Sequence, residues 1–125
     1  MAEPRFPKLR LARAQRLQLS RDFARTRELG ERRARGCLLV NWRRLAPGES
    51  SKVGVVTSRR IGSAVVRNRA RRLMREAFRR NQTRLARPVT LVLVARASIV
   101  GQPLARVEQD YLALLRDAHL LAASA

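Results

Sequence analysis

Residues 65–80 constrain this chain more than any other stretch. They contain neither glycine nor proline, and most of them favour the helix. At 3.6 residues per turn, the apolar side chains fall on one stripe, the pattern of a helix packed on a core: Val66, Ala70, Leu73, Met74 and Ala77. Ser63 is a candidate N-cap. We therefore expect a long amphipathic helix that rests on the remainder of the fold.

The opposite side of this helix is strongly basic. It carries Asn68, Arg71, Arg72, Arg75 and Arg79, while Arg67 and Phe78 lie near the seam. Like charges one turn apart repel each other by roughly 0.2–0.5 kcal/mol per pair, and Glu76 is the only acidic residue of the stretch. Solvated helices usually mix both signs of charge, so this face predicts a polyanionic partner.

The whole chain has the same charge bias. Lys and Arg number 28 against 9 Asp and Glu, which gives a net charge of +19 over 125 residues. Nucleic acid is the natural partner, and its binding should depend strongly on salt. Arginine in place of lysine fits RNA, although a GC-rich genome would give the same ratio. A membrane surface is a weaker alternative because the core needs the apolar helix face. DNA is weaker still, since no short turn joins a partner helix.

The length suits one domain. Residues 1–16 contain Pro4, Pro7 and five basic groups, and we interpret them as a flexible basic arm that precedes a packed domain at 17–125. Cys37 is the only cysteine, which excludes a disulfide framework and fits a reducing cytoplasm. Its place in an apolar run favours a buried, small apolar side chain. We see no secretory signal and no segment long enough to span a bilayer.

The first half of the domain predicts a helix and two strands. A helix should run from Ser20, as its cap, to about Leu29, with Gly30 as a left-handed stop. Residues 31–35 are interpreted as a charged connector and residues 36–42 as a strand. Residues 46–51 form a turn-rich loop, and residues 52–58 are predicted to pair antiparallel with the first strand through it.

The second half predicts one strand and one helix. Residues 89–95 are almost wholly apolar, as expected of a central strand covered on both faces. Pro103 suits a first helical turn. A core-facing stripe then marks the last helix: Leu104, Val107, Tyr111, Leu114, Leu115 and Ala118. The prediction is therefore a single α+β domain.

Motifs for chemistry by the protein itself are absent. The only histidine, His119, stands late in the last helix, where a surface or capping role is more common than a catalytic one. No acid pair, phosphate loop or zinc spacing is present. Two aromatic residues stay open between core and stacking roles, namely Phe23 and Trp42. The turn at 58–63, with its basic pair and glycine before a helix, is a candidate phosphate cradle.

Residues 60–79 resemble the signature of the bacterial ribonuclease P protein subunit. That family carries Arg-Asn-Arg after Gly-x-Ala-Val-Val and before Leu-x-Arg-Glu-Ala-Phe, and this chain matches it at residues 62–66, 67–69 and 73–78. Residues 58–60 are similar to the family's Ser-Lys-Lys segment, and residues 21–23 to its Arg-Asp-Phe. The order of predicted elements extends the resemblance over roughly residues 17–121.

The resemblance implies a fold and a function. The fold would be an α/β sandwich of about four mainly antiparallel strands and three helices, of the class named after a ribosomal protein domain, with a left-handed βαβ crossover. The protein would join a catalytic RNA that removes the 5′ leader of precursor tRNA, with Mg²⁺ bound mainly by the RNA. Residues implied to bind the catalytic RNA are Arg67, Asn68, Arg69, Arg71, Arg72, Arg75 and Arg79. Residues implied to line a leader cleft are Phe23, Val40, Trp42, Ser58, Arg59 and Arg60.

Two departures from the family pattern concern that cleft. Arg27 stands where the family usually has a second aromatic residue, and Asn41 and Trp42 occupy the region where its first strand often ends in tyrosine. Trp42 is a candidate replacement for the missing stacking surface. The alternative function from another class is a ribosomal or other structural RNA-binding protein without a role in tRNA processing, which would share the charge and size.

Overall fold

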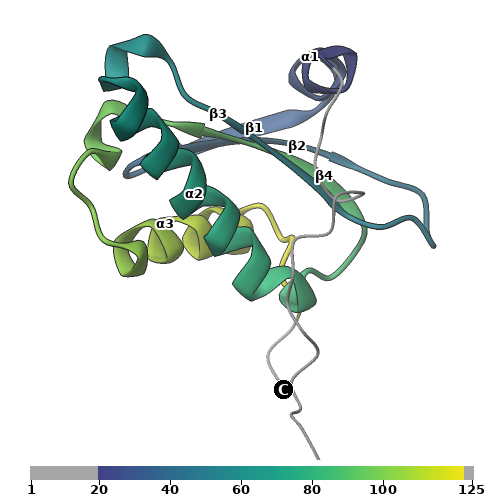
Figure 1. The fold of residues 1–125 in the computed structure, drawn as a ribbon. Helices are drawn as coiled ribbons and strands as arrows, with labels where there is room; N and C mark the ends of the chain where they lie inside the picture. The colour runs from purple at the N-terminus through teal and green to yellow at the C-terminus, as the bar shows by residue number, and fades with distance from the viewer. Residues whose placement is uncertain (1–19, 123–125) are drawn as a thin grey trace, which may run out of the picture.

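The computed structural model describes residues 20–122, which form three helices and a four-stranded sheet (Figure 1). The arm predicted at residues 1–16, the predicted start of packing at Leu17 and the side chain of Ser20 lie outside the described part. The elements in chain order are α1 (Ser20–Leu29), β1 (Glu31–Arg35), β2 (Leu38–Arg44), β3 (Lys52–Val56), the 3₁₀ turn η2 (Arg59–Ile61), α2 (Ala64–Asn81), η3 (Gln82–Arg84), β4 (Val89–Ala95), η4 (Ala97–Ile99) and α3 (Leu104–Asp117).

The sheet has the strand order β1-β2-β4-β3. The β1–β2 and β2–β4 pairs are antiparallel and the β3–β4 pair is parallel, which confirms a mainly antiparallel sheet. The predicted antiparallel pairing of residues 52–58 with the first strand is wrong, because β4 lies between β2 and β3. The chain at both ends of this loop bonds instead to residues at the entry to β4: Leu45 N–H donates to Pro88 O (3.0 Å) and Val89 N–H donates to Ser51 Oγ (3.0 Å).

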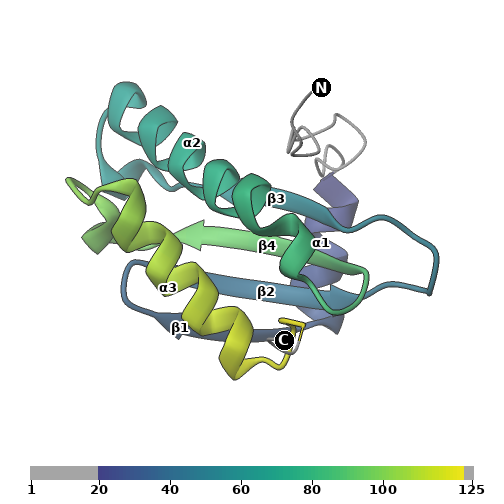
Figure 2. The ribbon, with the colours of Figure 1, turned by 90° about the horizontal axis from the view of Figure 1, so that it is seen from below.

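The β3–α2–β4 unit has the rarer hand. In Figure 2, α2 lies in front of the sheet, β4 points to the left, and parallel β3 lies above it. When this view is rotated so that both strands point upward and α2 is still in front, β4 lies to the left of β3. A crossover with this arrangement is left-handed. Sequence physics alone favours the right-handed connection. The structure confirms the hand that the family resemblance implies.

Helices cover both faces of the sheet, with α1 on one face and α2 and α3 on the other (Figure 1). The main core lies on the α2–α3 face and includes Val40, Trp42, Leu91, Leu93, Met74, Phe78 and Tyr111. The predicted stripe of α2 is confirmed, since Ala70, Met74 and Ala77 are buried and Val66 and Leu73 pack against the core. Phe78 is fully buried and therefore belongs to this stripe rather than to its seam.

Residues Glu31–Arg35 form β1, so the predicted charged connector is wrong. The strand pairs with β2 in register, with Arg33 opposite Val40, yet all five of its side chains are exposed. Because neither face is buried, the sequence lacks the alternation by which strands are recognised. Charged side chains on an edge strand discourage pairing with another chain.

Gly30 ends α1 for a reason other than the predicted one. It does not adopt a positive φ, so the left-handed stop is wrong. Its N–H donates to Thr26 O (2.9 Å), and a Cβ at this position would clash with Trp42 O and lie 2.5 Å from Thr26 O. Glycine is needed here because the end of α1 and the β2 backbone approach closely. At the other end of the chain, Pro103 is the N-cap of α3 and precedes its first turn.

Candidate RNA interface

The basic face of α2 is presented to solvent because the opposite side of the helix is held in the core. Ser63 is the N-cap, as predicted, and its Oγ accepts a hydrogen bond from Val66 N–H (3.4 Å). Asn68, Arg69 and Arg72 are exposed. The other predicted contacts on this helix are half-buried: Arg67, Arg71, Arg75 and Arg79. The structure therefore brings the seven predicted RNA-binding residues together on one helix, with the Nε of Arg67 buried.

Neutral oxygens position several of these groups. Arg71 donates to Thr57 Oγ1 (2.7 Å), just after β3, and also to Asn68 Oδ1. Arg69 donates to Gln102 O in the loop before α3 (2.9 Å). Such bonds restrict a guanidinium without neutralising it. The charge stays available, and less side-chain entropy is lost when an anion binds.

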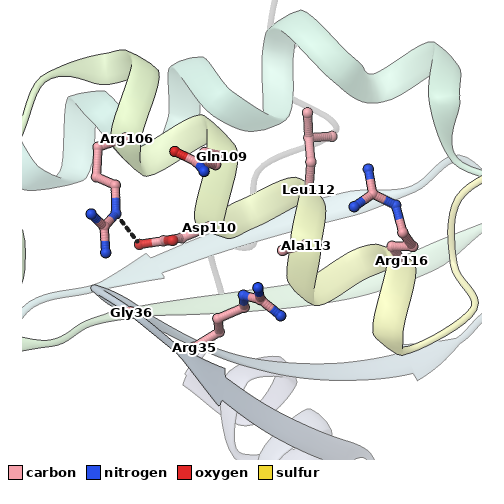
Figure 3. Close-up of a pocket in the computed structure, with 8 residues that line it drawn as sticks. All are labelled: Arg35, Gly36, Arg106, Gln109, Asp110, Leu112, Ala113 and Arg116. Carbon is pink, nitrogen blue, oxygen red and sulfur yellow. Dashed lines mark hydrogen bonds and ion pairs between the residues drawn. The ribbon is translucent and has the colours of Figure 1, made fainter.

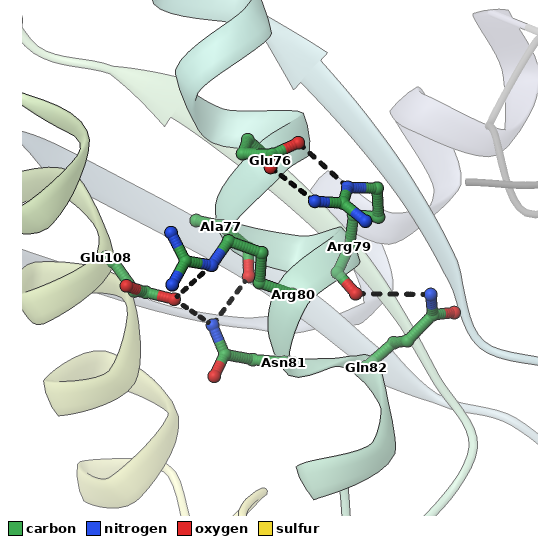
Figure 4. Close-up of polar contacts among 7 residues, drawn as sticks. All are labelled: Glu76, Ala77, Arg79, Arg80, Asn81, Gln82 and Glu108. Atoms are coloured by element: carbon green, nitrogen blue, oxygen red, sulfur yellow. Dashed lines mark hydrogen bonds and ion pairs between the residues drawn. The ribbon is translucent and has the colours of Figure 1, made fainter. Parts of the chain in front are cut away.

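Carboxylates pair with arginines at the C-terminal end of α2 (Figure 4). Arg79 pairs with Glu76, its Nε lying 2.9 Å from Glu76 Oε1, and this bond lowers the pKa of Glu76 and raises that of Arg79. Arg80 pairs with Glu108 across to α3 (3.6 Å). Within residues 20–122, four guanidiniums of α2 form no ion pair with a carboxylate: Arg67, Arg69, Arg71 and Arg72.

A second arginine cluster contrasts with this face. Arg35, Arg106 and Arg116 line a hollow of about 490 Å³ between the β1–β2 turn and α3 (Figure 3). Here acids accompany the cations, because Arg106 pairs with Asp110 (3.2 Å) and Arg35 pairs with Asp117 (3.3 Å). This hollow therefore has acidic partners of a kind that Arg67, Arg69, Arg71 and Arg72 lack within residues 20–122.

Asp110 is the buried polar link between α3 and the β1–β2 turn. It is only 5% exposed and accepts hydrogen bonds from Cys37 N–H (3.0 Å) and Arg106 Nε (3.2 Å). Burial alone would raise the pKa of the Asp110 carboxyl, but the hydrogen bonds from Cys37 and Arg106 outweigh it and leave the pKa below its usual value. A charged Asp110 that accepts hydrogen bonds from both elements therefore holds them together.

Cys37 should be nearly inert in the folded protein. Burial, followed by the hydrogen bond to Asp110 and its negative charge, raises the pKa of the thiol to about 12. Since the thiolate is the nucleophile, alkylation by iodoacetamide at about pH 8 should be at least a hundredfold slower in the native protein than in denaturant. Mass spectrometry of timed samples measures both rates, and comparable rates would contradict the buried thiol.

The residues implied to line a leader cleft do not form one surface. Phe23 is half-buried on α1, and the exposed Ser58, Arg59 and Arg60 lie at the turn into α2. These two groups stand at different ends of the sheet (Figures 1 and 2). Trp42 and Val40, at 3% and 0% exposure, belong to the core on the other face from α1, so their place in an open cleft is wrong. Trp42 does not replace the missing aromatic residues.

The α1 face of the sheet carries residues that the sequence interpretation missed. Because side chains alternate along a strand, core positions 40 and 42 direct Leu39, Asn41 and Arg43 toward α1. Arg43 Nε and Thr26 Oγ1 are buried and have no hydrogen-bond partner among the described residues. The alternation around Trp42 was the signal that could have found Asn41 and Arg43.

A small α/β sandwich that carries an arginine helix, with four of its arginines lacking a carboxylate partner within residues 20–122, defines an RNA-binding protein. The family model of ribonuclease P matches residues 11–119, and the chain belongs to this family. It is 33% identical over 110 residues to the ribonuclease P protein component of Syntrophomonas wolfei, with 88% of this chain and 92% of that protein aligned. It is 37% identical over 116 residues to that of Chloroflexus aurantiacus, with 90% and 84% aligned.

Solved structures agree with the fold. The ribonuclease P protein of Thermotoga maritima superposes with a TM-score of 0.72 at 29% identity, covering 82% of this chain and 96% of that one. The Staphylococcus aureus protein superposes with a TM-score of 0.78 at 20% identity, covering 86% of this chain and 98% of that one.

None of the helices within residues 20–122 combines the length and the apolar character that a membrane span requires.

Proposed function

We propose that this chain is the protein subunit of ribonuclease P, which binds the catalytic RNA through α2 and assists removal of the 5′ leader from precursor tRNA in the cytoplasm. The observation that carries the proposal is the set of four α2 arginines without carboxylate partners in residues 20–122. RNA phosphates would neutralise them. The contacts would extend along the predicted residues from Arg67 to Arg79, with Arg79 contributing least because Glu76 already pairs with it.

The proposal assigns the chemical step to the RNA. No group of three His, Cys, Asp or Glu residues within 20–122 is placed to hold a metal ion, and His119 is exposed beyond α3 with a left-handed backbone (φ 59°). Mg²⁺ would therefore be bound mainly by the RNA, where it would stabilise the charge that develops at the cleaved phosphate. The part of this chain is to place cations against the RNA backbone, which reduces the Mg²⁺ that folding and substrate binding require.

For the leader we propose the α1 face of the sheet. Phe23 supplies the aromatic surface, and half-buried Arg43 offers an Nε that lacks a hydrogen-bond partner among the described residues. A single strand needs stacking and backbone neutralisation more than sequence readout. Ser58, Arg59 and Arg60 are kept as contacts at the turn into α2, where their exposure fits phosphate binding.

A precursor-tRNA cleavage assay tests the proposed function. Adding the protein to the ribonuclease P RNA of its host at low Mg²⁺ should raise the cleavage rate by about tenfold or more, equivalent to roughly 1.4 kcal/mol, because protein cations replace part of the ion atmosphere. The stimulation should fade as Mg²⁺ is increased. No stimulation at any Mg²⁺ concentration, together with co-sedimentation of the protein with ribosomal subunits, would favour the structural RNA-binding alternative.

A further inference from the structure

An apolar hollow adjoins the basic face of α2. It lies between the first turns of the helix and the η4–α3 loop, has a volume of about 170 Å³, and is lined by Val65, Val66, Ala70, Ile99 and Val100, with Arg69 as its charged member. Small-molecule sites usually measure roughly 300–1,000 Å³. This hollow therefore suits a single ring rather than an extended segment.

The apolar side chains at its edge are unusually accessible. Val65 is 77% exposed and Val100 is 48% exposed, and only one other large apolar residue of the described part, Leu29, is exposed. Isolated exposed apolar residues are common, but two that border one apolar hollow indicate a contact surface. In a protein of net charge +19, that surface lies beside Arg69, which has no carboxylate partner within residues 20–122.

Arg69 gives the hollow its charge complementarity. Its guanidinium donates to Gln102 O (2.9 Å), which fixes the side chain across from the loop, and it forms no ion pair with a carboxylate of residues 20–122. The site thus combines an apolar floor with a positioned cation. A nucleotide carries the matching pair of groups, an apolar ring face and a phosphate.

We propose that this hollow receives one unpaired base of the ribonuclease P RNA, whose neighbouring phosphate meets Arg69. The inference rests on the proposed function and adds to it a base contact at an interface otherwise made of phosphate contacts. A paired base is hidden in its stack and cannot enter, so the site would select a looped-out or bulged nucleotide. Charge repulsion disfavours a second copy of this chain as the occupant. If an apolar side chain of another protein filled the hollow instead, Val65→Thr and Val100→Thr would bind the RNA as tightly as wild type.

The test replaces Val65 by threonine, which keeps the shape but puts a hydroxyl in place of a methyl group. Binding of the host ribonuclease P RNA, without precursor tRNA, is measured over a range of salt concentrations. We expect affinity to fall by about fivefold to tenfold, within the range of base stacking on protein side chains, and the slope against salt to stay unchanged because no charge is removed. Val100→Thr should show a smaller effect of the same kind.

Leu29→Thr is the matched control, an exposed apolar residue on α1 that should leave RNA affinity unchanged. Dimethyl sulfate and carbodiimide probing should show one unpaired base that the wild-type protein protects and the Val65→Thr variant leaves reactive. The inference is overturned if Val65→Thr and Val100→Thr bind as tightly as wild type, if Leu29→Thr weakens binding equally, or if protection is unchanged. Failure of the wild-type protein to bind this RNA would instead overturn the proposed function.

Discussion

Replacing Arg67 and Arg71 together by alanine is expected to weaken binding of the ribonuclease P RNA by about ten- to a hundredfold near 0.15 M salt. The two residues are one helical turn apart on the half-buried part of the basic face, and neither has a carboxylate partner in residues 20–122. Each phosphate that loses its guanidinium keeps its counterions. The slope of log affinity against log salt should therefore fall by roughly two.

Filter binding or fluorescence anisotropy at five or more salt concentrations measures both quantities. The matched control is Arg33→Ala with Arg116→Ala, which removes the same two charges from exposed positions on β1 and α3. It should reduce affinity only slightly, through the long-range field. If both double variants lose the same affinity and slope, binding follows total charge and α2 has no special role.

The helix that makes this prediction possible was readable from the sequence. Its apolar period, its N-cap and its single-signed face are local properties, and the structure places Ser63, Met74 and Ala77 as the pattern predicts. The central strand was equally clear, because Val89–Ala95 is apolar at nearly every position and buried on both faces. Sequence patterns that lie within a single helix or strand therefore predicted that element correctly.

The pairing of the strands with one another was harder to predict from the sequence. The turn-rich loop after β2 suggested a hairpin with β3, yet β4 from far along the chain inserts between them, a pairing decided by burial of its two apolar faces. Strand β1 was not predicted because Glu31–Arg35 buries no side chain and pairs with β2 through its backbone. Neither fact has a local cue in the residues concerned.

The leader site shows how one residue of register changes an interpretation. Trp42 and Asn41 are neighbours in sequence but face opposite sides of the sheet, since side chains alternate along a strand. The Trp42 side chain lies in the core and is 3% exposed, whereas the Asn41 side chain lies on the α1 face. A large aromatic side chain beside two arginines suggests stacking on RNA, yet the gain from burying it in the core decides its side.

Replacing Asp110 by alanine is expected to lower the free energy of unfolding by about 1–3 kcal/mol, the usual cost of leaving a buried donor such as Cys37 N–H without its acceptor. The carboxylate satisfies Cys37 N–H and Arg106, and both would lose their acceptor. Gly36, in the left-handed conformation (φ 55°), is fitted to it, since a Cβ there would lie 2.6 Å from Asp110 Cγ. The β1–β2 turn would therefore loosen from α3.

The pH dependence follows from the lowered pKa of Asp110. The unfolded chain binds this proton near pH 3.9, whereas the folded protein holds the carboxylate charged to lower pH. Its contribution is therefore present above about pH 4 and is lost as pH falls through the folded pKa. Urea unfolding between about pH 7 and pH 3 should show wild type and Asp110→Ala converging at the acid end.

Asp117→Ala provides the control on the same helix. Asp117 pairs with Arg35, and both side chains are about half exposed, at 45% and 56%. Water screens such a pair, so its loss should change stability by about 1 kcal/mol or less. The comparison isolates burial as the cause, because both variants remove one aspartate from α3 that pairs with an arginine. Equal losses at pH 7, or an Asp110 effect that persists unchanged to pH 3, would mean that Asp110 stabilises the turn by packing and not by its charge.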